Sequence, residues 1–149
     1  MTKYVAPAAS VQQPSITPDE AGDIYCVRGS LTVPATLALN DVVQMVKLPA
    51  DCVPTEFTLD FDALAASGLA MSIGFTDGTS GQTGAEFRAA GALANAAGIQ
   101  RMDSNLVSRI ASVSTGDRTV GVTVTTAGTT PAAGVLGFTM NYRPTRYGA

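Results

Sequence analysis

Carboxylates are the side chains in this sequence whose spacing comes closest to a chemical site. Asp60 and Asp62 flank Phe61, so on an extended strand both carboxylates point to the same face. Asp77 ends a second strand-like segment and could approach them, which would give the oxygen-rich surroundings that Ca²⁺ prefers. No calcium-loop spacing surrounds these residues, so we favour solvated charges that keep the outer strand face wet. We predict no metal site and no cofactor.

The sequence contains no histidine, which removes the commonest general base, the usual nucleophile pairs and the usual transition-metal ligand. Cys26 and Cys52 lie in or beside strand-like segments. A cross-sheet disulfide is geometrically conceivable, but two reduced thiols that pack as small hydrophobic groups are favoured. The glycines of segment 74–84 lack the strand–helix context of a phosphate loop. We therefore predict that the protein is not an enzyme.

Composition favours assembly over catalysis. The chain has 149 residues, which suits one domain, and only 14% of them are charged, against about 25% in typical proteins. Large uncharged surfaces are more often interfaces than free faces. Lysine occurs only at Lys3 and Lys47, and no basic stripe is interleaved with aromatic residues, so we expect no nucleic-acid binding. No apolar run reaches the roughly 18 residues of a membrane helix, so we expect no membrane partner.

Period-2 alternation of apolar residues predicts the strands that would carry these side chains. Segment 41–48 is apolar on both faces, so we expect the core to cover one side and a loop or partner to cover the other. Gly29 is interpreted as a bulge position. About seven to eight strands with regular turns predict an all-β fold, an antiparallel β-sandwich of jelly-roll or Ig-like layout. The strands are expected near 23–33, 41–48, 53–61, 69–76, 105–113, 120–125 and 136–142.

We divide the chain into an extended N-terminal arm at 1–22, a sandwich domain at 23–142 and a C-terminal tail at 143–149. Prolines disfavour helix in the arm, which is either a tether along a neighbouring subunit or a frayed terminus. Segment 77–104 is predicted to be a long excursion, with a flexible loop and a short helix in its alanine-rich part at 85–97.

Arginines and tyrosines of the excursion, the following strand and the tail are the candidate partner contacts. Guanidinium groups can pair with acidic patches, and aromatic and arginine side chains are enriched at interface anchors. The candidates are Arg88, Arg101, Arg109, Tyr142, Arg143, Arg146 and Tyr147.

Segments 42–50, 53–62, 73–78 and 137–142 resemble small structural proteins of tailed-phage head modules, specifically capsid decoration, or cement, proteins with a β-sandwich or jelly-roll body. The resemblance covers residues 23–142 and supplies no catalytic residues. It implies a homodimer or homotrimer that is made in the host cytoplasm and binds the major capsid protein on the virion exterior. There it would span capsomer boundaries and reinforce the shell against internal DNA pressure.

A carbohydrate- or receptor-binding accessory module of a phage tail or fibre is the alternative. Sugar sites commonly stack on exposed aromatic rings. This sequence has no tryptophan and only 6% aromatic residues, which favours the capsid interpretation.

Overall fold

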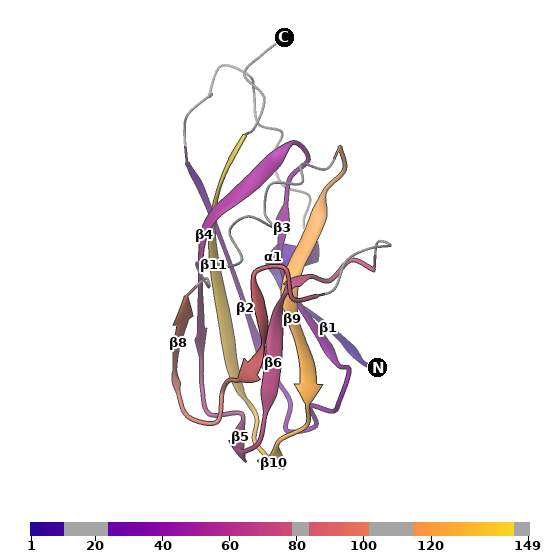
Figure 1. Ribbon diagram of the computed structural model, residues 1–149, viewed down its shortest axis with the longest axis vertical. Coiled ribbons are helices and arrows are strands. Elements are labelled where there is room, and N and C mark those ends of the chain that lie inside the picture. Colours follow the sequence, from indigo (N-terminus) through magenta and orange to yellow (C-terminus); the bar gives the residue numbers. More distant parts are fainter. Residues whose placement is uncertain (11–23, 79–83, 102–114, 145–149) are drawn as a thin grey trace.

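Two β-sheets stacked face to face form the body of the protein in this computed structural model (Figure 1). The structure describes residues 1–10, 24–78, 84–101 and 115–144. Within these residues a four-residue α-helix is the single helix, so the predicted all-β fold class is confirmed. The elements are β1 (Lys3–Val5), α1 (Pro7–Ser10), β2 (Tyr25–Val33), β3 (Val42–Leu48), β4 (Cys52–Phe61), β5 (Ala65–Ser67), β6 (Ala70–Phe75), β7 (Arg88–Ala92), β8 (Gly98–Arg101), β9 (Arg118–Thr126), β10 (Thr129–Pro131) and β11 (Gly134–Pro144).

The chain passes repeatedly from one sheet to the other. The five-stranded sheet has the order β1-β3-β9-β6-β7, and the four-stranded sheet has the order β2-β11-β4-β8. A short β10-β5 pair closes one end of the sandwich (Figure 1). All ladders are antiparallel except the one between β1 and β3. The described residues contain no helix with the length and hydropathy that a membrane span requires.

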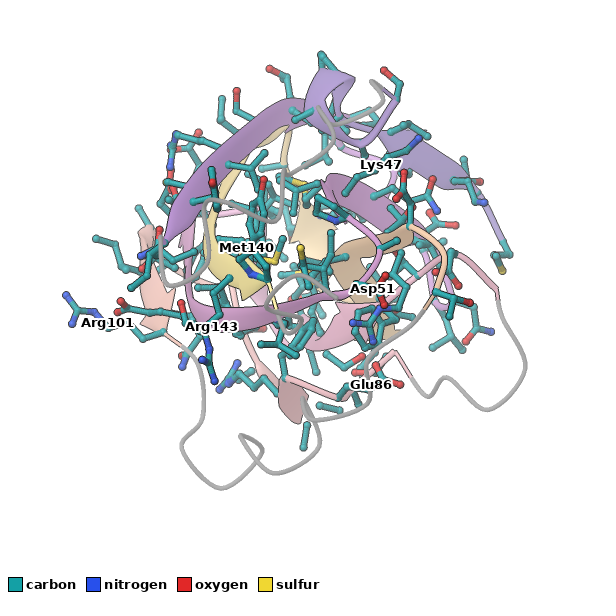
Figure 2. The ribbon with its side chains drawn as sticks, turned by 90° about the horizontal axis from the view of Figure 1, so that it is seen from above. Lys47, Asp51, Glu86, Arg101, Met140 and Arg143 are labelled. Atoms are coloured by element: carbon teal, nitrogen blue, oxygen red, sulfur yellow. The ribbon has the colours of Figure 1, made fainter. Side chains whose placement is uncertain are left out.

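Alternate residues of the central strands bury their side chains between the sheets, as the period-2 pattern predicted. Phe57 stacks on Phe138 within the four-stranded sheet, with ring centroids 5.2 Å apart. Phe87 packs edge-on against Phe57 at 5.9 Å and against Phe75 of the opposite sheet at 5.0 Å. Seen along the long axis, Met140 lies in the interior that the ribbons enclose (Figure 2). One aromatic cluster therefore joins the two sheets.

The short helix predicted within 85–97 is wrong. This segment instead forms β7, and the following residues form β8, the edge strands of the two sheets. Burial of Phe87 and the bond from its amide to the carbonyl of Ile73 fix the segment beside β6. Gly91 lowers the helix propensity of the segment. Pairing of β7 with β6 and of β8 with β4 provides the backbone hydrogen bonds that a helix would otherwise provide.

The first ten residues differ from the extended arm predicted over 1–22. Strand β1 pairs in parallel with β3, Ala6 is fully buried, and α1 packs against β3 and β2. Pro7 begins α1, where its missing N–H is not needed. The N-terminus thus occupies the edge of β3 and its junction with β2, and the predicted cover on the second face of β3 by a loop or partner stays a prediction. The remainder of the arm, at 11–22, lies outside the described residues, as does the strand predicted at 105–113.

Asp41 holds this N-terminal segment in place. Its side chain is only 2% exposed and accepts hydrogen bonds from the amides of Thr2, at 2.6 Å, and Ala38, at 3.0 Å. Burial raises the pKa of Asp41, but the bonds from Ala38 and Thr2 act in the opposite direction, and the net pKa is lowered.

Gly29 serves a purpose other than the predicted bulge, since β2 pairs with β11 without a register shift there. A Cβ atom at Gly29 would collide with the main-chain carbonyl of Met45 on β3. The glycine therefore permits the two sheets to approach closely at this side of the sandwich.

Phe87→Ala is expected to lower the free energy of unfolding by about 3–5 kcal/mol, because removal of the ring leaves a cavity where the two sheets meet. Urea unfolding at constant pH measures the change. Leu39→Ala is the control, since Leu39 is 53% exposed and its truncation should matter by less than about 0.5 kcal/mol. Equal effects of the two substitutions would contradict the assignment of Phe87 to the core.

Asp41→Asn is expected to lower the free energy of unfolding at pH 7 by about 1–3 kcal/mol, because one amide loses its buried acceptor. Hydrogen exchange should accelerate most at the amides of Ala6 and Val42, which bond across the β1–β3 junction. Asp62→Asn provides the control, since that exposed carboxylate accepts one amide, from Val135. Unchanged protection of Ala6 and Val42 would show that Asp41 does not hold β1.

Candidate interaction surface

The carboxylates with site-like spacing do not meet in the structure. Asp60 pairs with Arg28, and Asp62 accepts the amide of Val135 at 2.8 Å. Asp77 follows β6 of the other sheet and accepts the amide of Thr119. Within the described residues no group of three His, Cys, Asp or Glu side chains is placed to bind a metal ion.

The two cysteines are not placed for a disulfide or for catalysis. Both are free: Cys52 is buried on β4 and Cys26 is exposed on β2, with β11 between these strands. Two strand spacings are about 9.5 Å, more than a disulfide can span. Burial raises the pKa of Cys52 to about 11, so this thiol stays protonated at neutral pH.

The outer surface of the four-stranded sheet is uncovered by any described element, and we call it the open face. Cross-strand partners point to the same side of a sheet, so the register identifies its members. Most of them are small or polar, and several are exposed. The open face comprises Cys26, Arg28, Ser30, Thr32, Glu56, Thr58, Asp60, Ile99, Arg101, Val135, Gly137, Thr139, Asn141 and Arg143.

A charge pair spans three strands at the centre of the open face. The guanidinium of Arg28 donates to both carboxylate oxygens of Asp60, at 2.7 and 2.8 Å, and to the hydroxyl of Thr139 at 2.7 Å. Gly137 makes room for the pair, because a Cβ atom there would collide with both charged groups. The bond from Arg28 lowers the pKa of Asp60. The two charges cancel, which leaves this region neutral.

The five-stranded sheet presents a covered outer surface by contrast. Gln44 is 8% exposed and donates to the carbonyl of Thr76 at 2.8 Å. Gly74 lies under the backbone of Gly84 and Ala85 and the carboxylate of Glu86, which accepts the amide of Phe75 at 2.9 Å. The sandwich therefore has two unlike outer surfaces.

Two of the predicted partner contacts lie on the open face. Arg143 is exposed on β11, and Arg101 is exposed at the end of β8 and projects away from the body (Figure 2). Arg88 is half-buried at the start of β7, in the opposite sheet. Tyr142 is only 4% exposed and stacks on Tyr25 with centroids 5.8 Å apart, so it contributes to the core and not to the surface.

Three other predicted contacts, Arg109, Arg146 and Tyr147, lie outside the described residues. The sequence interpretation missed Arg28 as a surface residue with a role, because its partner is 32 positions away. It also missed Ile99, which is 68% exposed. The alternation of side chains in Gly98–Arg101 could have predicted a strand there. It was not used because the neighbouring alanines were interpreted as a helix.

Asp60→Asn is expected to lower the free energy of unfolding at pH 7 by less than about 1 kcal/mol, because the side chains are 52% and 35% exposed to water. The lowered pKa of Asp60 means that the pair stabilises the protein above the unfolded-state pKa of about 3.9. This contribution is lost as the pH falls through the folded-state pKa. Urea unfolding between pH 2 and pH 7 should show the difference between wild type and variant disappearing at the acid end.

The Arg28→Gln background is the control for this measurement. There Asp60→Asn should have almost no further effect, since the partner is gone. An undiminished effect would assign the stabilisation to another neighbour of Asp60.

No protein-family model matches the chain, and the comparison with curated proteins found no match. Solved structures do match. A chain from the capsid of Ralstonia phage GP4 is 27% identical, with a TM-score of 0.78, and the match covers 96% of this chain and 98% of that one.

Two further structures share the fold at lower identity. A chain of the cyanophage Pam1 capsid asymmetric unit is 18% identical over 91% of this chain and 95% of that one, with a TM-score of 0.70. A chain of the acid-stable capsid of Helicobacter pylori bacteriophage KHP30 is 16% identical over 85% and 91%, with a TM-score of 0.57. The resemblance to phage head proteins seen in the sequence is confirmed.

Proposed function

We propose that this phage capsid-related protein is a decoration, or cement, protein that binds the outer surface of the phage head. In this role it stabilises contacts between subunits of the major capsid protein. The observation that carries the proposal is the open face: one outer surface of the sandwich is neutral at its centre and is not covered by any described element, while the other is closed by segment 84–86 of the chain itself.

The side chains of the open face suit a broad, rigid contact. Ser30, Thr32, Thr58 and Thr139 are short, so holding them against a partner costs little conformational entropy. The Arg28–Asp60 pair is already satisfied, so docking leaves no uncompensated charge at the centre. Strands hold these groups at fixed spacings, which favours a contact that needs little rearrangement.

The match to the Ralstonia phage GP4 capsid supports a separate subunit. It covers nearly the whole of both chains, so the described fold accounts for most of that capsid chain. A homodimer or homotrimer would present several open faces at once. Their combined binding exceeds that of one face because the second contact forms at high effective concentration.

The carbohydrate- or receptor-binding alternative gains no support from the described residues. In the described part of the chain every aromatic side chain is buried or half-buried, whereas sugar sites commonly stack on fully exposed rings. The expectation that the chain is not an enzyme stays a prediction.

Adding the protein to phage heads that lack it is expected to give saturable binding and greater resistance of the heads to heat. Cys26 provides a built-in probe, because it is exposed on the open face while Cys52 is buried. The rate of maleimide labelling of Cys26 should fall in proportion to occupancy on the heads. Mass spectrometry of the labelled peptides measures this labelling rate.

Labelling after unfolding in urea, which exposes both thiols, confirms that each peptide is detected. Saturated heads with unchanged heat resistance would contradict the cement role. Full labelling of Cys26 at saturation would show that a surface other than the open face makes the contact.

A further inference from the structure

A shallow hollow opens on the side of the sandwich between β7 and β8. Its volume is about 360 Å³, and its walls are the side chains and backbone of residues 92–100. The half-buried ring of Phe61 also lines it and lies over Gly98, close enough that a Cβ there would contact the ring at 3.4 Å. Ile99 stands at the rim and is 68% exposed. Its lining combines apolar groups, among them Phe61 and several alanines, with the polar groups of Asn95 and Gln100, so its apolar part can accommodate one side chain.

The same side carries the free edge of a sheet. Strand β8 pairs with β4 alone, so one row of its backbone amides and carbonyls faces no strand among the described residues. Such an edge can accept an extended segment of another protein, with the main chain giving affinity and pockets giving specificity.

Arginines give this side a positive charge. The guanidinium of Arg88 lies over Gly91, next to Ala92 in the wall of the hollow, and its Nη1 atom is buried without an acceptor in the described residues. Arg101 is exposed at the end of β8. A buried donor without an acceptor is costly, and a carboxylate is its strongest partner.

Edge strands are also kept short and charged to prevent unwanted pairing, and β8 has only four residues. That purpose does not require a large exposed apolar side chain, a hollow or a buried unpaired guanidinium beside the edge.

We propose that the β7–β8 side binds an extended, acidic segment of a neighbouring capsid subunit. The segment pairs its main chain with β8, places an apolar side chain in the hollow and directs a carboxylate to Arg88. Ile99 and Arg101 also belong to the open face, so this contact continues the surface assigned to the proposed function, on which it rests.

Ile99→Asp tests the proposal by placing a negative charge at an exposed position. Its affinity for heads that lack the protein is expected to fall at least about tenfold, the size of an interface anchor's loss. Arg88→Gln should also weaken binding and reduce its dependence on salt. Leu39→Asp is the matched control, since Leu39 is a similarly exposed apolar residue in the β2–β3 connection, and it should bind as wild type. Circular dichroism confirms that each variant is folded.

Crosslinking identifies the occupant directly. An Ile99→Cys variant in the Cys26→Ser background, labelled with a thiol-reactive benzophenone, is expected to crosslink to a peptide of another capsid protein that contains Asp or Glu. Crosslinks to a second copy of this chain would overturn the proposal, as would wild-type affinity of Ile99→Asp. If wild type itself does not bind heads, the proposed function fails, whereas failure of the Ile99 and Arg88 tests alone leaves it standing.

Discussion

The contact between the inner faces of the two sheets is the interaction on which this structure depends. Strands of one sheet alternate along the chain with strands of the other, so neither sheet can form from one continuous segment. The aromatic cluster of Phe57, Phe75, Phe87 and Phe138 joins them. Because most apolar side chains are used between the sheets, the outer surfaces are left to small and polar residues.

The outer surfaces of the two sheets differ in how far the chain covers them, and this difference bears on function. Segment 84–86 crosses the outside of the five-stranded sheet and closes it near Gly74. The four-stranded sheet keeps the open face, where Arg28 and Asp60 neutralise each other. The low charge of the whole chain is thus matched, on one surface, by an area without net charge at its centre. The structural role in a virion that the capsid neighbours support agrees with this arrangement.

The N-terminal segment completes the sandwich at its other side. Asp41 binds the amides of Thr2 and Ala38, and Ala6 is buried beside β3. A buried carboxylate whose hydrogen bonds hold its pKa down contributes to stability at neutral pH and not in acid. The first ten residues consequently belong to the body, and their removal would expose an apolar strand and not merely shorten an arm.

Alternation of apolar residues was enough to predict the all-β class, the strands at 41–48, 53–61 and 69–76, and the burial of residues such as Phe57 and Ile73. These properties follow from side-chain direction, which repeats every two residues along one strand. Tertiary structure alone decided that the alanine-rich segment contributes the edge strand β7, that Tyr142 is interior, and that Arg28 pairs with Asp60. Each of these features depends on which strands, distant in sequence, become neighbours in the fold. The strand pairing is selected by burial of the whole core, and no local sequence pattern encodes it.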